Sequence, residues 1–292
     1  MTAHIKLEGA VTAQFDPFID IDWDAPEFEI RRDDPRWVLP ETDPVAHTDW
    51  YRNLPLDRRI EVGLWRQAGI AKAGLQFESI LIQGTQQFVM RLPNNAAEFR
   101  HCGQEMIEAH SHIQMLQELI NRIGADVPGM SRRVKRLSPY IGMLAYFPTI
   151  FFILTLASKE PKTRSQPSDH PLLHLITGIH LAEEERRIGF AREFIVGQLE
   201  DAGRLRRAAL SLLLPIILRV TVNVTGMPHP KFQRTFDVPD ETMRQAFWRS
   251  EHSRNLLRDS FTGTRAFAED IGLLTARTRW LWRLLNIEEG KS

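Results

Sequence analysis

One short segment of the sequence, H-L-A-E-E-E-R-R, combines side chains that bind metals with side chains that carry positive charge. His180, Glu184 and Arg187 follow one another at steps of four and three, so a helix places them in one row on one face. The same row is apolar before it, at Ile176, and after it, at Phe190. Buried charges are costly unless they are paired or bound to a metal, so this row needs partners on other helices.

Other segments with helical periodicity also place carboxylates and imidazoles on faces that are otherwise apolar. Glu78 lies in line with Leu75 and Ile82, and Glu160 lies in line with Phe152 and Leu156. A further row with steps of three and four contains His101, Glu105, Glu108, His112, Met115 and Leu119. Carboxylates and imidazoles that converge from several helices are the ligands of dinuclear iron or manganese sites. Without a cation, such carboxylates would repel one another or be protonated.

The elements that must position these side chains are helices. Helical periodicity begins after residue 55, and we expect helices over 56–91, 95–124, 133–160, 169–201, 205–225 and 240–260, then a C-terminal pair up to residue 287. Gly74 is a candidate break within the 56–91 helix. Asn95 and Asp169 are the expected N-caps of the 95–124 and 169–201 helices, and Gly124 is expected to end the former. Since no alternating strand pattern appears, the predicted class is all-α.

The N-terminal residues differ from the rest in composition. Residues 1–55 carry prolines and aromatic residues in loose clusters without a sustained period. We therefore expect an extended arm over 1–55 that packs its aromatic side chains onto a helical bundle domain over 56–292. Histidines near the start of the 169–201 helix, His170 and His174, are expected to be exposed.

The composition excludes some classes of protein. Among 292 residues, Lys+Arg and Asp+Glu both number 37, so no basic excess is available for general nucleic-acid binding. The single cysteine, Cys102, allows no disulfide within the chain and suits a reducing cytoplasm. Of two apolar runs, 140–157 is borderline in length for a membrane span and 208–218 is too short. We expect both to be buried core helices and membrane insertion to be the minor alternative.

With these motifs in place, the sequence resembles the ferritin-like diiron oxygenases related to p-aminobenzoate N-oxygenase. The resemblance covers roughly residues 15–200 and is strongest in GLQFESILIQG, in EFRHCGQEMIEAHSHIQMLQELINRIGADVPGM and in HPLLHLITGIHLAEEERRIGFAREF. The family's metal pattern is a lone Glu, then E-x-x-H, then a lone Glu, then H-x-x-x-E-x-x-H. It implies a ferritin-like bundle, two iron ions and O₂ as co-substrate. The implied ligands here are Glu78, Glu108, His112, Glu160, His180 and Glu184.

The second helix departs from that pattern. Ala109 stands at the glutamate of E-x-x-H. Glu108 replaces it at a spacing of four from His112, whereas the alternative register, Glu108 with Ser111, loses the imidazole. The register of this motif is therefore open.

Two basic residues depart from the pattern as well. Arg187 stands at the last histidine, and Lys159 stands beside the third carboxylate. An arginine stays protonated and cannot ligate a metal. We expect Arg187 to pair with Glu184 or Glu78 and to neutralise charge that iron would otherwise neutralise. The iron count of two, one or none is thus left open.

The first functional hypothesis is an O₂-dependent oxygenase. The resemblance implies N-oxygenation of an arylamine or hydroxylation of a C–H bond in secondary metabolism, with an external electron donor and a homodimeric assembly. The expected apolar lining for the small organic substrate consists of Phe77, Phe88, Phe147, Phe151 and Phe152. Candidate catalytic residues beside the metals are Glu105 and Arg187.

Two further hypotheses belong to other classes. In a metal-free descendant, Arg187 and Lys159 replace the metal cations, and the cavity binds a small acidic or aromatic ligand. Glu105 or His112 would then act as a base in non-redox chemistry. In a membrane-surface protein, basic and aromatic residues near the C-terminus would face lipid. These residues are Arg277, Arg279, Trp280, Trp282 and Arg283.

Overall fold

The computed structural model describes residues 15–159 and 169–289, and within these ranges it contains helices and no strand. The all-α class is confirmed. The main helices are α2 (Leu56–Val89), α3 (Ala97–Ile123), α4 (Arg132–Gly142), α5 (Pro148–Lys159), α6 (Pro171–Glu200) and α7 (Arg204–Gly226). The shorter ones are α1 (Asp49–Arg52), α8 (Pro230–Phe236), α9 (Asp240–Arg244), α10 (Glu251–Ser260), α11 (Thr262–Asp270) and α12 (Arg279–Leu284). Single 3₁₀ turns lie at Pro26–Phe28, Pro35–Trp37, Pro44–His47 and Met143–Tyr146.

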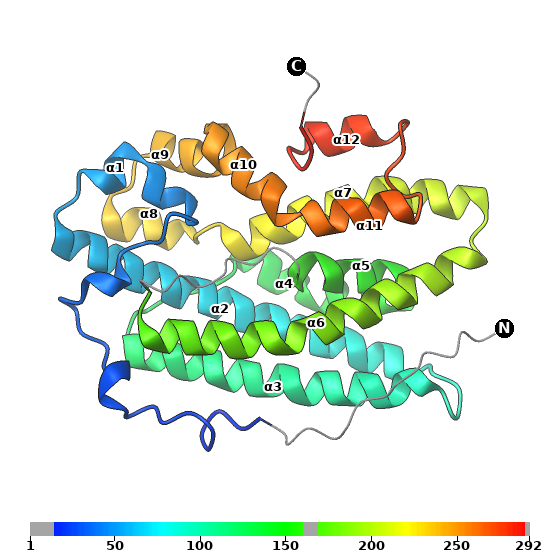
Figure 1. Cartoon of the computed structure of the whole chain (residues 1–292), viewed down its shortest axis with the longest axis horizontal. Coiled ribbons are helices and arrows are strands. Elements are labelled where there is room, and N and C mark those ends of the chain that lie inside the picture. Colours follow the sequence, from blue (N-terminus) through cyan, green and yellow to red (C-terminus); the bar gives the residue numbers. More distant parts are fainter. Residues whose placement is uncertain (1–14, 160–168, 290–292) are drawn as a thin grey trace.

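The long helices form a ferritin-like bundle. In Figure 1, α2, α3 and α6 run along the long axis of the molecule. Helix α2 packs along α3, and α5 packs against both α6 and α7. This arrangement turns the inner faces of α2, α3 and α6 toward a shared interior.

Several helix boundaries differ from the expected ones. Helix α2 continues through Gly74, and α3 starts at Ala97 because Asn95 adopts a left-handed conformation with φ of 66°. Gly124 ends α3 in the left-handed conformation, as predicted. The expected 133–160 helix is interrupted between α4 and α5, and Pro148 opens α5 where its missing N–H costs nothing.

A second interruption divides the expected 240–260 helix. Residues Gln245–Arg249 form a π-helical turn between α9 and α10. This wider turn ends at Ser250, whose hydroxyl caps α10 by accepting a hydrogen bond from the Ser253 N–H. The chain therefore changes direction at a place where hydrophobic periodicity alone shows no break.

The N-terminal arm packs onto the bundle, as its aromatic composition predicts. Trp23, Trp37 and Tyr51 are buried in one apolar cluster with residues of α2, α3, α6 and α8. The arm passes beneath α3 and around one end of the bundle (Figure 1). A β-carbon at Gly63 of α2 would lie 1.7 Å from the Trp37 carbonyl oxygen, so only glycine allows this close approach. The division into two units at residue 55 remains a prediction.

His170 corrects one expectation. It caps α6 by accepting a hydrogen bond from the Leu172 N–H, and its ring stacks on Trp37 at 4.5 Å between centroids. It is fully buried, so the expected exposure is wrong there, whereas His174 is exposed as predicted. The expected N-cap, Asp169, lies one residue before the observed one.

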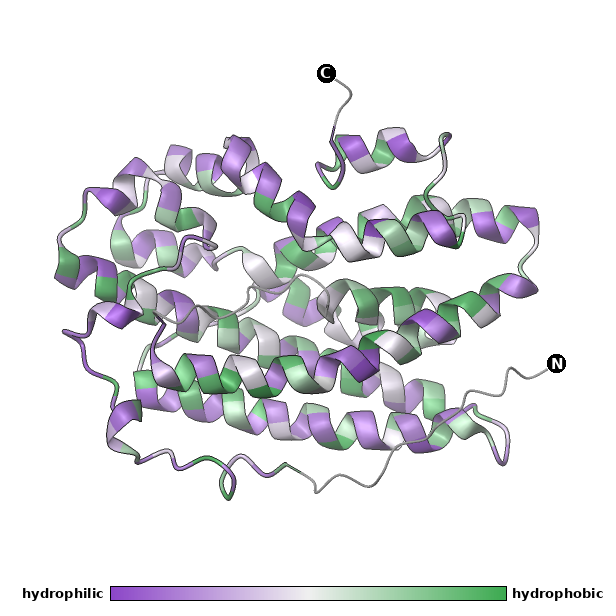
Figure 2. Cartoon of the chain, viewed as in Figure 1, coloured by the Kyte–Doolittle hydropathy of each residue, from purple (hydrophilic) through white to green (hydrophobic). Residues whose placement is uncertain are grey.

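Polar side chains separate two apolar cores along the bundle. One core contains Phe77, Phe152 and Phe190, and the other contains Met115 and Ile176. Buried polar residues between these positions include Glu78, Glu108, His112, Glu184 and Arg187. Figure 2 shows the corresponding hydrophilic segment midway along α6. The candidate site is therefore a polar layer closed by apolar packing on both sides.

The outer helices keep apolar side chains at the surface. In the run 140–157, the residues from Phe151 to Ala157 are mostly buried. Four residues before them are exposed, namely Tyr140, Met143, Tyr146 and Phe147. The expected core helix is therefore only partly found. The segment Arg204–Phe236, which comprises α7 and α8, is the one within the described ranges that is long and apolar enough to cross a membrane, by length and composition alone. The run 208–218 lies in it and is only partly buried, with Leu212 and Ile216 exposed, so the expected core helix is only partly found there too. In α12, Trp282 is fully buried while Trp280 is 58% exposed.

Candidate metal centre

Three potential metal ligands converge in the polar layer. Glu78 of α2, His112 of α3 and His180 of α6 each offer a ligand atom, and these atoms lie within 4.8 Å of one another. The exposed fraction is 3% for Glu78 and 0% for His112, whereas the His180 side chain is 29% exposed, so the cluster is shielded on the α2 and α3 sides and open to water at His180. Two imidazoles and a carboxylate are the donor set of mononuclear non-haem iron sites, and this set fits one ferrous ion.

The histidine of α6 is oriented by a carboxylate on its own helix. His180 Nε2 lies 2.8 Å from Glu184 Oε1, one turn further along, and Glu184 is buried. Because only the imidazole can donate in this pair, Nδ1 of His180 presents its lone pair on the opposite side. That atom lies 3.2 Å from Nδ1 of His112. Two imidazole nitrogens that face each other this closely need a cation or a proton between them.

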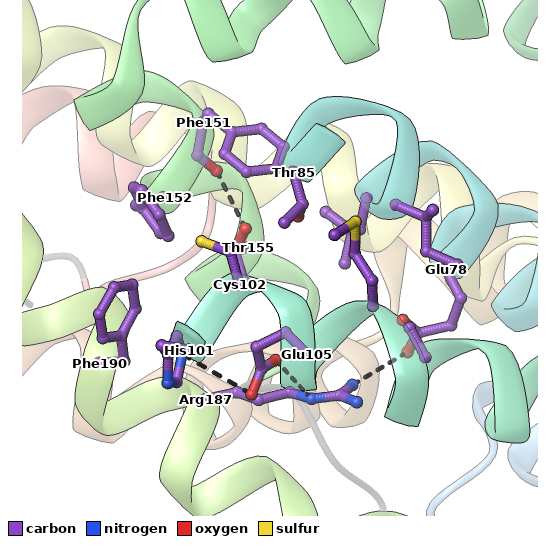
Figure 3. Close-up of a pocket in the computed structure, with 14 residues that line it drawn as sticks. Glu78, Thr85, His101, Cys102, Glu105, Phe151, Phe152, Thr155, Arg187 and Phe190 are labelled. Carbon is purple, nitrogen blue, oxygen red and sulfur yellow. Dashed lines mark hydrogen bonds and ion pairs between the residues drawn. The ribbon is translucent and has the colours of Figure 1, made fainter. Parts of the chain in front are cut away.

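Arg187 fills the space beside these donors. Its Nε lies 2.6 Å from Glu105 Oε2, its Nη2 lies 3.5 Å from Glu108 Oε2, and its Nη1 lies 3.8 Å from Glu78 Oε1. The guanidinium is 3% exposed and reaches across the interior from α6 to α3 and α2 (Figure 3). A single buried cation thus contacts three carboxylates, which distributes its charge among acceptors that would otherwise repel one another.

Arg186 reinforces this arrangement from the surface. Its half-exposed side chain hydrogen-bonds to Glu108 and lies 3.8 Å from Glu105. Glu108 also accepts a hydrogen bond from the Gln104 amide. Both carboxylates therefore contact guanidinium groups, whose positive charge offsets theirs.

The structure separates the sequence-predicted site residues into groups. Glu78, His112 and His180 meet, and Glu184 lies directly behind His180. Glu108 and Glu105 contact the two arginines. The expected contact between Arg187 and Glu78 is present, but the shortest contact of Arg187 is with Glu105. The sequence placed Glu105 on the inner face of its helix but did not identify Arg187 as its partner. Glu160 lies outside the described residues.

The structure shows which of the two candidate partners of Glu108 lies on the inner face of α3. His112 points into the bundle, whereas the Ser111 hydroxyl donates to the Phe15 carbonyl of the N-terminal arm. Glu108 and His112 therefore share the inner face, although their side chains serve different partners. Ala109, also on this side of α3, lines a cavity.

That cavity adjoins the Arg187 side of the layer. It measures about 40 Å³, and the residues that line it are Glu78, Leu81, Ile82, Thr85, His101, Cys102, Glu105, Met106, Ala109, Phe151, Phe152, Thr155, Arg187 and Phe190 (Figure 3). The prediction that Phe151 and Phe152 line it is confirmed. Phe77 and Phe88 instead lie in the apolar core, and Phe147 is 62% exposed. This space admits O₂-sized molecules, whereas drug-sized ligands occupy about 300–1,000 Å³.

Two further residues of the cavity wall were given no role from the sequence. His101 stacks on Phe190 at 3.7 Å between centroids, and burial, followed by the charges of Arg186 and Arg187, lowers its pKa to about 4. Burial, followed by the charges of Glu105 and Glu98, raises the pKa of Cys102 to about 12. At neutral pH the wall therefore presents an uncharged imidazole and an unreactive thiol. The sequence feature that could have identified His101 is its position in the row of residues at steps of three and four along α3.

Comparisons with known proteins agree with this architecture. Residues 2–272 match the family described as P-aminobenzoate N-oxygenase AurF. The uncharacterized proteins Mb0909 of Mycobacterium bovis and Rv0885 of Mycobacterium tuberculosis are each 41% identical over 289 residues, which cover 96% of this chain and 85% of theirs. No solved structure gives a significant match. The family is one of diiron-type oxygenases, and by its match over nearly the whole length this chain belongs to it.

Proposed function

We propose that this protein is an O₂-dependent non-haem iron oxygenase that oxidises a small organic substrate. The observation that carries the proposal is the convergence of Glu78, His112 and His180 in a buried layer between two apolar cores. Two imidazoles and a buried carboxylate that converge here form a donor set that a divalent cation would satisfy, and the cation would offset the cost of burying the carboxylate charge.

The residues of the chain supply binding, orientation and exclusion of water. Glu78, His112 and His180 would hold the iron, and the bound iron supplies the reduction of O₂. Glu184 fixes the His180 ring so that one nitrogen faces the centre. Phe151, Phe152 and Phe190 keep the adjoining space apolar, which protects reactive oxygen species from bulk water.

The substrate class follows from family membership rather than from the shape of the cavity. An arylamine nitrogen or a C–H bond is the proposed position of oxidation. Since the cavity measures only about 40 Å³, such a substrate would have to displace wall side chains, and the aromatic ones are positioned to stack on it. An external electron donor, a homodimeric assembly and a cytoplasmic location are further parts of this proposal.

Iron binding is the test. The purified protein, loaded anaerobically with Fe(II) and desalted, is expected to retain iron and to consume O₂ with a reductant. His180→Ala and Glu78→Ala should lose most of the iron, while His174→Ala, an exposed histidine of the same helix, should retain it. Elemental analysis and an oxygen electrode measure both. Absence of iron from the loaded wild-type protein would refute the proposal.

A metal-free activity is the alternative that one observation favours. The buried guanidinium of Arg187 already neutralises carboxylates that a metal neutralises in the family pattern. In that case the cavity would bind a small acidic or aromatic ligand. However, the Glu105 carboxylate is engaged by Arg187 Nε, which makes it a poor base and leaves His112 for that role.

A further inference from the structure

We infer that the centre holds a single metal ion and that the guanidinium of Arg187 stands in the place of the second. This inference rests on the proposed function, because it specifies the content of the same site. The family is of diiron type, so the chain would keep the fold and half of the centre while replacing the other half with a fixed cation.

The two halves of the layer have different chemistry. On one side, Glu78, His112 and His180 form the cluster of potential ligands, and Glu78 also adjoins the other side, 3.8 Å from Arg187 Nη1. On the other side, Glu105 and Glu108 contact guanidinium nitrogens at 2.6 Å and 3.5 Å from Arg187. A carboxylate oxygen that faces a guanidinium directs its lone pairs toward that group. This side of the layer therefore already contains a cation, the guanidinium of Arg187, in place of a metal ion.

Two of the departures from the family pattern fall at ligand positions, and both residues line the cavity beside the layer. These residues are Ala109 and Arg187, and Glu105 and Glu78 line the same cavity. One removes a carboxylate ligand, and the other replaces an imidazole ligand with a group that cannot ligate. Each of the two paired motifs has therefore lost one ligand, on α3 and on α6, while Glu78, His112 and His180 remain together.

Formal charge agrees with one ion. The described acidic side chains around the centre are Glu78, Glu105, Glu108 and Glu184. Arg186 and Arg187 offset two of these four negative charges, which leaves two. One divalent cation with neutral histidines cancels that remainder, whereas two would leave excess positive charge beside a buried guanidinium.

Arg187 is held in place by its surroundings. Arg187 is 3% exposed, and withdrawing it would leave Glu105 and Glu108 with only the half-exposed Arg186 as a cation. Removing one partner of a buried ion pair is strongly destabilising, so the guanidinium does not give way readily to an incoming ion. Its neighbour Arg186 is half-exposed and lies at the edge of the layer.

The test measures metal stoichiometry without relying on activity. Anaerobic titration with Fe(II) should load one iron per chain, and the protein oxidised afterwards should show the EPR signal of an isolated high-spin ferric ion. A coupled ferric pair is EPR-silent. Two irons per chain with no such signal would overturn the inference while leaving the proposed oxygenase intact, whereas no iron would refute the proposed function itself.

A restored variant tests the role of the arginine. The double variant A109E/R187H should bind two irons per chain and lose the isolated-ion signal, while R186Q, which changes the neighbouring guanidinium, should still bind one. A folded double variant that binds one iron would show that Arg187 does not replace the second ion. If the double variant fails to fold, the wild-type stoichiometry and EPR signal decide.

Discussion

At the scale of single residues, burial sets the ionisation of His101. Its ring is stacked on Phe190 in the cavity wall, and desolvation lowers its pKa to about 4 in the folded protein. In the unfolded chain the same imidazole titrates near its ordinary value of about 6.5. Between these two values, the unfolded state binds a proton that the folded state does not, so stability rises with pH across this window.

We therefore predict that the free energy of unfolding falls as the pH is lowered from about 6.5 to about 4, by up to on the order of 3 kcal/mol from this residue. His101→Gln should show a smaller fall across the same window, and His174→Gln, at an exposed position, should behave like the wild type. Urea titrations at several pH values measure this. Parallel losses in the wild type and His101→Gln would contradict the assignment.

Glu184 acts on the centre through His180. The 2.8 Å contact with Nε2 selects the tautomer that presents Nδ1 to the metal position. Glu184→Gln is expected to weaken iron binding about 10–100-fold, because an amide orients the ring less strongly than a carboxylate does. Competition with a chelator measures the affinity.

The control for that experiment is the neighbouring glutamate. Glu185→Gln changes an exposed carboxylate one residue further along α6 and should leave the affinity unchanged. Equal iron affinity in Glu184→Gln and in the wild type would show that His180 is oriented by other contacts.

At the scale of helices, hydrophobic periodicity is a sufficient guide to which segments are helical but not to where they break. The predictions for α2, α3, α6 and α7 agree with the structure within a few residues. The interruption before α5 and the π-helical turn before α10 were missed. The first break has a local signal in Pro148, which favours a helix start, whereas hydrophobic periodicity carries no signal for the π-helical turn.

The docking of the arm on α2 depends on a single glycine. A β-carbon at position 63 would overlap the Trp37 carbonyl oxygen, whereas one at Gly69 of the same helix would meet the Trp65 ring at an ordinary 3.5 Å. Gly63→Ala should therefore destabilise the protein by about 1–3 kcal/mol through forced displacement of the arm. Gly69→Ala should be neutral or stabilising by up to about 1 kcal/mol, because alanine favours helices.

Thermal unfolding, together with limited proteolysis of the arm, measures both glycine variants. Gly63→Ala should expose the arm to cleavage at temperatures where Gly69→Ala and the wild type resist it. Equal resistance of the two variants would show that the approach of Trp37 to α2 does not limit stability.

At the scale of the whole molecule, the inward direction of the site residues could be predicted, but not which of them pair. Steps of three and four in the sequence are enough to place Glu105, Glu108 and His112 on one face of α3. The choice of Glu105 as the shortest contact of Arg187 depends on the axial offset between α3 and α6. That offset is set by packing in both apolar cores, and no local sequence pattern predicts this packing.

The same dependence on distant partners applies to the ion pair that connects the arm, α2 and α7. Arg66 Nε lies 2.8 Å from Asp43 Oδ2, both side chains are 5% exposed, and Arg66 Nη2 donates to the Gly226 carbonyl at 2.6 Å. Asp43 also accepts a hydrogen bond from the Val45 N–H through its other oxygen. One guanidinium therefore satisfies acceptors from two segments that lie far apart in sequence.

Replacing Arg66 with methionine leaves a buried carboxylate and a helix-terminal carbonyl without this donor, and we predict a loss of about 3–5 kcal/mol in the free energy of unfolding. Arg58→Met removes an exposed pair with Glu61 on the same helix and should cost less than about 1 kcal/mol. Because Arg66 holds both segments, its loss should also lower the unfolding cooperativity, seen as a smaller denaturant slope. If the Arg66→Met and Arg58→Met variants unfold at the same denaturant concentration with the same slope, the buried pair does not join these parts of the molecule.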